Sequence, residues 1–124
     1  MQAYYDNKPS KFEEISNIGV KYRHNIVEVE APAGEDEAPR TQWRCEEVDV
    51  YHQVTRGKIV AAVINDRWDN NHEQKLINEY NSAVMGVYSE EEKQAKITAY
   101  KNFLDERNAL KAEVYADCEE AGIK

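Results

Sequence analysis

The hydrophobic pattern changes its period about halfway along the chain. Residues 27–30 read Val-Glu-Val-Glu, an alternation typical of a strand with one buried face. Beyond residue 55, apolar residues recur three and four positions apart, which is typical of amphipathic helices. The pattern therefore predicts a single domain over 1–124, with a β-rich part over 1–54 and a helical part over 55–124.

Two runs in the first half have strand character, residues 22–30 and residues 41–54. The segment between them, residues 31–40, contains two prolines, a glycine and three consecutive acidic residues, which favour a loop. Two such runs around a loop predict an antiparallel hairpin with a long connection. Tyr4 and Tyr5 form a further short strand candidate.

The second run carries apolar residues on both parities. Trp43 and Cys45 fall on one parity, and Val48 and Val50 fall on the other. Because successive strand residues point to opposite faces, one extra residue is needed to bring all four onto the core face. We therefore predict a β-bulge at residues 46–47.

The first segment of the helical part has two interpretations. The spacing of the apolar residues in 59–64 is helical, and Thr55 is placed to cap the helix. However, four of the seven residues in 58–64 are β-branched, which favours a buried strand. Sequence alone leaves both open.

Two further helices have clear start signals. Residues 71–74, Asn-His-Glu-Gln, have the form of a capping box, and an apolar stripe follows until Gly86. Ser89 then precedes three glutamates, and no glycine or proline occurs before Gly122. The last helix is thus predicted to run from Glu90 to about Ala121.

This last helix is too long for a compact domain. At 1.5 Å per residue it spans about 48 Å, whereas a compact domain of this length is roughly 35 Å across. Either the helix bends around residues 102–108, or its end meets a partner.

Composition and charge restrict the function classes. The 24 acidic and 16 basic residues give a net charge of −8, which disfavours binding to nucleic acid phosphates or to anionic membranes. The longest apolar run is too short for a membrane span, the N-terminus lacks signal-peptide features, and two cysteines cannot form a disulfide scaffold. We expect a folded, cytoplasmic protein with a tyrosine-rich core.

No motif of catalysis, phosphate binding or metal ligation is present. The five glycines form no nucleotide-binding loop, and His72-Glu73 is not followed by the second histidine of a zincin. Cys45 and Cys118 are 73 positions apart, without the spacing of a zinc site. We expect no catalytic residue, no metal and no cofactor, with a small Cys/His metal or thiol protein as an alternative.

Six residues are candidates for protein contacts. On the sheet, Tyr, Trp and Arg side chains dominate binding hot spots, but large aromatic rings in a leucine-poor chain are more often the core itself. On the long helix, Arg107 interrupts the apolar stripe, either as a stem lying over apolar surface or in an ion pair with Glu79 or Asp105. The candidates are Tyr22, Trp43, Tyr51, Arg107, Leu110 and Val114.

Four stretches resemble small uncharacterised prophage-encoded proteins: residues 25–29, 39–48, 71–81 and 100–107. The resemblance covers most of the chain and implies a phage tail, virion-associated or assembly role. It assigns no activity and carries over no functional residue. Localisation would then be virion-associated instead of cytoplasmic.

Taken together, the sequence predicts an α+β fold. An N-terminal antiparallel β-meander or hairpin is expected to pack against two to three C-terminal helices, the last one long. The first functional hypothesis is a non-enzymatic interaction protein that self-associates or binds a protein partner through the C-terminal helix. An acidic regulatory protein that mimics nucleic acid charge is the alternative.

Overall fold

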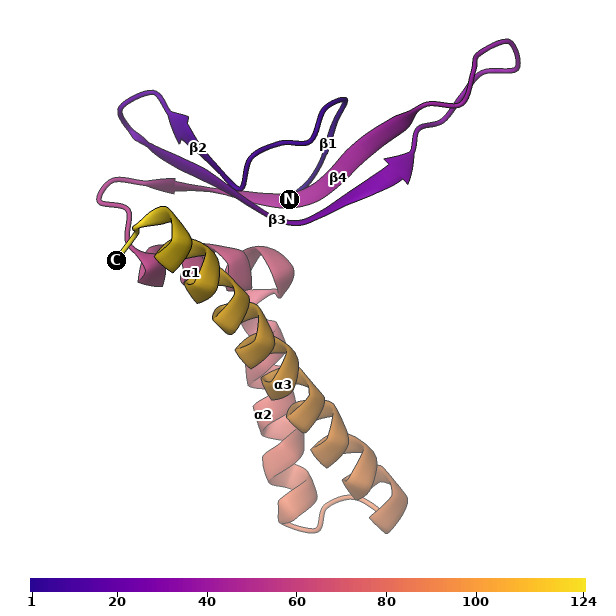
Figure 1. The fold of residues 1–124 in the computed structure, drawn as a ribbon. Helices are drawn as coiled ribbons and strands as arrows, with labels where there is room; N and C mark the ends of the chain where they lie inside the picture. Colours follow the sequence, from indigo (N-terminus) through magenta and orange to yellow (C-terminus); the bar gives the residue numbers. More distant parts are fainter.

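A computed structural model describes residues 1–124 and confirms the α+β fold. Four antiparallel strands form one sheet, and three helices follow it in the chain (Figure 1). The elements are β1 (Gln2–Tyr5), β2 (Phe12–Ile15), β3 (Gly19–Glu30), β4 (Thr41–Tyr51), α1 (Arg56–Arg67), α2 (Asn70–Val84) and α3 (Glu90–Ala121).

The strand order is β1-β4-β3-β2. Strands β2, β3 and β4 follow one another as a meander. The β3–β4 hairpin is the one that the sequence predicts, whereas β2 is not among the predicted strands. Strand β1 pairs instead with β4 at the far edge, so the β1–β2 connection crosses the sheet. This is a Greek key in reverse chain order: β4, β3 and β2 are joined by hairpins, and β1 lies beside β4 after the connection that crosses the sheet.

The predicted bulge at residues 46–47 is wrong, because the irregularity lies in the partner strand. His24 pairs with Glu46 and Val27 pairs with Arg44, so two residues of β3 oppose Cys45 alone. Asn25, the first of the two, has φ of 53°, a conformation that asparagine adopts more readily than most residues. Consequently β4 stays regular and Cys45 faces away from the helices.

The core lies between one face of the sheet, α1 and the C-terminal half of α3. Residues 59–64 are helical, and the Thr55 side chain caps α1 by accepting from the Lys58 amide at 3.2 Å. Of the two interpretations that the sequence left open, the structure shows the helix, because burying one stripe against the sheet outweighs β-propensity. The main core cluster consists of Tyr22, Val50, Ile59, Val60, Val63, Val114 and Cys118.

A buried polar contact fixes α3 to the sheet. The Tyr22 hydroxyl donates to the Asp117 carboxylate at 2.6 Å, and Lys11 Nζ donates to the other carboxylate oxygen at 2.9 Å. Burial and the neighbouring Asp117 raise the pKa of Tyr22, which therefore stays neutral and donates. The last turns of α3 are thus held against β3 and the start of β2.

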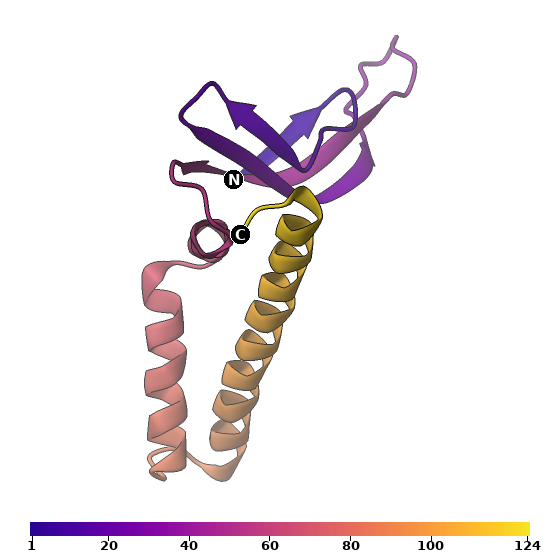
Figure 2. The ribbon, with the colours of Figure 1, turned by 60° about the vertical axis from the view of Figure 1, so that its left-hand side comes forward.

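Helix α3 is continuous over 32 residues. Ser89 Oγ accepts from the Glu92 amide at 3.3 Å, and Gly122 ends the helix in the left-handed conformation with φ of 75°. Both predicted caps are confirmed. The excess length is not absorbed by a break, because α3 extends past the sheet (Figure 2).

Candidate interaction site on a projecting helical arm

Helix α2 and the N-terminal half of α3 form an arm that projects from the sheet. The two helices run antiparallel, side by side, and their shared tip is the part of the molecule farthest from the sheet (Figures 1 and 2). We define the arm as α2 together with residues 90–107 of α3. The rest of α3 packs with α1 beneath the sheet, so α3 runs through both the arm and the body, and a two-residue link joins α1 to α2.

Aromatic and charged pairs close the seam between the two arm helices. The rings of Tyr80 and Tyr100 lie 5.1 Å apart between centroids. Lys96 Nζ lies 3.5 Å from a Glu79 carboxylate oxygen. These contacts fix the register of the antiparallel pair along the arm.

The base of the arm is built around Phe103. This buried ring makes T-shaped contacts with the rings of Trp68 and His72, at centroid distances of 5.1 and 5.5 Å. Arg107 pairs with Glu73 across the two helices and lies 5.6 Å from the Phe103 ring centroid. Arg107 therefore forms an ion pair, but its partner is neither of the two carboxylates that the sequence suggested.

The tip of the arm is apolar and open to solvent. Val84, Met85 and Val87 are 56%, 81% and 70% exposed. Gly86 makes the turn with φ of 83°, which disfavours any side chain there. The sequence pattern assigns Val84 and Val87 to the apolar stripe of the helix and Gly86 to its end. The missed signal is an apolar run at a turn, where polar residues normally stand.

The sequence-predicted contact residues do not form one surface. Tyr22 and Val114 are fully buried, so they belong to the core and cannot contact a partner in this fold. Tyr51 is 55% exposed at the end of β4. Trp43 is half-buried on the face away from the helices, with Lys8 Nζ 5.4 Å from its ring centroid.

Leu110 lies where the arm meets the body. It is half-buried and packs against the edge of the core. A small cavity of about 240 Å³ opens beside it, lined by Arg67, Trp68, Glu106, Ala109, Leu110 and Glu113. Arg107 and Leu110 are thus the only sequence-predicted residues near the arm.

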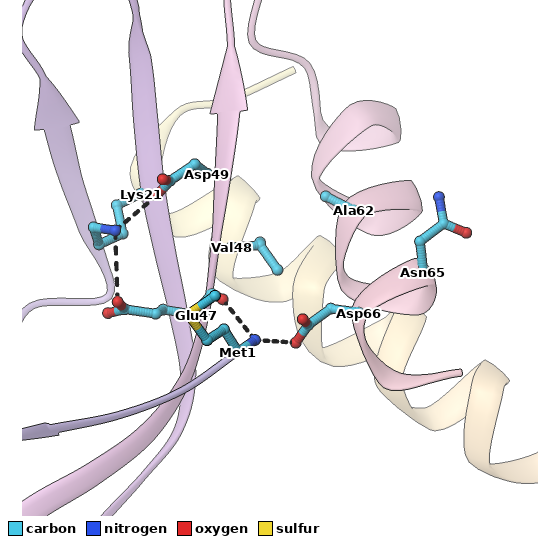
Figure 3. Close-up of a pocket in the computed structure, with 8 residues that line it drawn as sticks. All are labelled: Met1, Lys21, Glu47, Val48, Asp49, Ala62, Asn65 and Asp66. Carbon is cyan, nitrogen blue, oxygen red and sulfur yellow. Dashed lines mark hydrogen bonds and ion pairs between the residues drawn. The ribbon is translucent and has the colours of Figure 1, made fainter. Parts of the chain in front are cut away.

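A larger cavity of about 380 Å³ lies between the sheet and α1 (Figure 3). Its charged groups are paired with one another: the Met1 amine binds Asp66, and Lys21 Nζ donates to Asp49 at 2.8 Å. It contains no serine, cysteine, histidine or tyrosine side chain. The lining residues are Met1, Lys21, Glu47, Val48, Asp49, Ala62, Asn65 and Asp66.

Cys45 and Cys118 are both buried and free. Burial raises the pKa of each thiol, so both are less reactive than an exposed cysteine. No three histidine, cysteine, aspartate or glutamate side chains come together in a geometry that holds a metal ion. None of the helices is both long enough and apolar enough to span a membrane.

His24 is the one buried histidine, and its ring stacks on Tyr22 with centroids 5.6 Å apart. Burial lowers the pKa of His24 below its usual value, although carboxylates oppose the shift. The charged groups that face it are Glu46 of β4, Asp66 of α1, Glu113 of α3 and the Met1 amine.

Protonation of His24 is expected to destabilise the fold. Its pKa is lower in the folded state, so below about pH 6.5 the unfolded chain binds a proton that the folded chain does not. The free energy of unfolding should therefore fall as the pH drops from 7.5 to 5. Urea unfolding of the wild type and of His24→Gln measures this, and the stability difference between them should change over that range. A constant difference contradicts the assignment.

Comparisons with protein-family models, with curated proteins and with solved structures found no match for this chain. The resemblance to prophage-encoded proteins stays a prediction, and the arm has to be interpreted from its own geometry.

Proposed function

We propose that this chain is a non-enzymatic interaction protein that binds another protein chain through the arm. One observation carries the proposal: the chain has 8585 Å² of accessible surface. A compact monomer of 14.4 kDa has about 6,800 Å². This surface is about a quarter larger than that of a compact monomer, which reflects an extended shape to which the projecting arm contributes (Figure 2).

The arm has little core of its own. Among residues 70–107, only Ala83 and Phe103 are buried. Isolated helices are marginal in water, and their stability in proteins comes mainly from packing of an apolar face. A helix pair with two buried residues gains little from packing, so a partner that covers the arm would supply the missing burial.

A phage structural or assembly role is the specific form of this proposal. It rests on the sequence resemblance, and an arm that extends from a folded body suits a subunit that joins others. The absence of recognisable catalytic motifs in the sequence supports a non-enzymatic role. No comparable structural observation favours the acidic mimic or the Cys/His protein.

Site-specific photo-crosslinking tests the proposal. A photoreactive amino acid replaces Met85 at the tip of the arm, and a control chain carries it at Glu35 in the exposed β3–β4 loop. In cells that express the chain, position 85 should give a cross-linked species of one defined mass, and position 35 should give none. Equal cross-linking from both positions, or none from position 85, contradicts a role for the arm in binding.

A further inference from the structure

The two sides of the arm differ, and the Tyr80–Tyr100 contact in the seam defines them. Each helical residue turns by 100°, so the residues three before and four after Tyr80 lie about 40–60° to the same side of it. These are Ile77 and Val84, and the same steps from Tyr100 give Ile97 and Leu104. Because the helices are antiparallel, equal rotations bring both pairs to one side of the arm.

This side, which we call the open face, consists of Ile77, Val84, Ile97 and Leu104. Three of its residues are half-buried by the neighbouring helix, and Val84 is 56% exposed. The Glu73–Arg107 ion pair crosses the seam at the base, within about 20° of the Tyr80–Tyr100 line, and no other ion pair or hydrogen bond joins the two helices on this side. A two-helix arm therefore leaves a continuous apolar strip only partly covered.

The opposite side of the arm is already closed. The buried residues Ala83 and Phe103 lie there, and the Glu79–Lys96 ion pair spans the seam above them. At the base, Arg67 lies 3.6 Å from Glu106. The Glu79–Lys96 ion pair and the two buried side chains thus occupy one side, and the open face is the side available to a partner.

The margins of the open face carry few charges. The next residues outward on each helix are exposed and are mostly side-chain amides, with two charged exceptions, Glu90 and Lys101: Asn70, Gln74, Asn81, Glu90, Gln94, Lys101 and Asn108. Lys101 is paired within α3 with Asp105 at 2.9 Å, and Glu90 accepts from the Gln94 amide at 3.4 Å. The centre of the open face is therefore free of charged side chains, as the charge-depleted centre of a protein–protein interface is.

We propose that the open face binds the open face of a second copy of this chain, so that two arms form a symmetric four-helix bundle. This inference rests on the proposed function and names the partner. A chain with a net charge of −8 repels its own copy, so a self-interface has to exclude charge, as the open face does. A partner recognised by complementary charge would need a charged surface, which this face lacks.

The molecule has more surface than a compact monomer needs. Stable interfaces bury about 800 Å² on each partner. The surface in excess of a compact monomer, 8585 Å² against about 6,800 Å², is about twice that area and is shared between the arm and the projecting β3–β4 hairpin (Figure 1). In a twofold arrangement the open face of one copy meets the open face of the other. The four helices then enclose the apolar seam that the two helices of one arm leave partly exposed.

Leu104→Glu tests this, with Asn102→Glu as the matched control. Both substitutions place a glutamate on α3, but Asn102 is exposed about 160° around the helix from Leu104. Light scattering after size exclusion, over a concentration series, should give the wild type and Asn102→Glu twice the 14.4 kDa monomer mass. Leu104→Glu should raise the dimer Kd by at least about tenfold, because it places a charge at the interface centre.

Circular dichroism of each variant reports folding, and Leu104→Gln replaces the glutamate variant if that variant unfolds. A wild type that is monomeric at every concentration overturns the inference, as does a dimer equally weakened by both substitutions. A monomer that still cross-links from position 85 to another protein retains the proposed function but refutes self-association. A monomer without such a cross-link refutes both.

Discussion

Val114→Asp is expected to unfold the protein. Val114 is fully buried in the core, among residues of β3, α1 and the end of α3. Removing its apolar side chain costs about 1.5–3 kcal/mol, and an unpaired buried carboxylate costs several kcal/mol more. A typical domain is stable by only about 5–15 kcal/mol, so this one change removes most or all of the folding free energy.

The matched control is Leu110→Asp, one helical turn earlier on the same stripe. Leu110 is half-buried beside the small cavity at the base of the arm, so its carboxylate reaches water. Circular dichroism at pH 7 should show a folded Leu110→Asp chain and an unfolded Val114→Asp chain. Equal stability of the two variants would place Val114 outside the core.

These two residues also show how far the helical period predicts the fold. The helical spacing of apolar residues in α3 puts Leu110 and Val114 on one face, and in the structure both side chains lie on the face that packs against the core. That spacing contains no information on which element covers the face at each turn. Sheet and α1 cover the last turns of α3, whereas α2 alone covers the first ones, and only the tertiary arrangement distinguishes them (Figure 2).

Local signals predicted the helix ends well, because a cap depends on a few adjacent residues. Ser89 and Gly122 cap α3 as expected, and α2 begins two residues before the start that the capping box over 71–74 predicts, because Asp69 and not Asn71 is its N-cap. Strand features depend on a distant partner instead. The alternation of apolar residues in β4 predicts a bulge in β4, but the extra residue lies in the partner strand, where Asn25 and Ile26 of β3 both oppose Cys45.

A buried ionic cluster on the sheet face away from the helices also depends on partners that are distant in the sequence, so the sequence did not predict it. Arg23 is buried there, and its guanidinium donates to Glu47 at 3.1 Å, to Glu13 at 2.7 Å and to the Ser10 carbonyl at 3.2 Å. Three segments of the chain meet at one side chain. Without the strand register, which pairs Arg23 with Glu47, no sequence pattern links these residues.

Glu47→Ala is expected to destabilise the fold by about 3 kcal/mol. Glu47 is the less exposed of the two carboxylates on Arg23, and the Tyr5 hydroxyl also donates to it. Burial alone would raise the pKa of Glu47, but the hydrogen bonds from Tyr5 and Arg23 lower it, so the carboxylate is charged at neutral pH. Removing it leaves a buried guanidinium short of one counter-charge, which costs more than the pair contributes.

Glu13→Ala is the control, because it removes the other carboxylate from the same guanidinium. The Glu13 side chain is 55% exposed, so water replaces its contact and the loss should stay within about 1 kcal/mol. Urea unfolding at pH 7 measures both variants. If the penalty comes from the uncompensated charge, Arg23→Met combined with Glu47→Met should recover most of the stability that Glu47→Ala loses. If the double variant is at least as unstable as Glu47→Ala, the cluster stabilises the sheet through its hydrogen bonds. The unpaired charge of Arg23 is then not the cause of the lost stability.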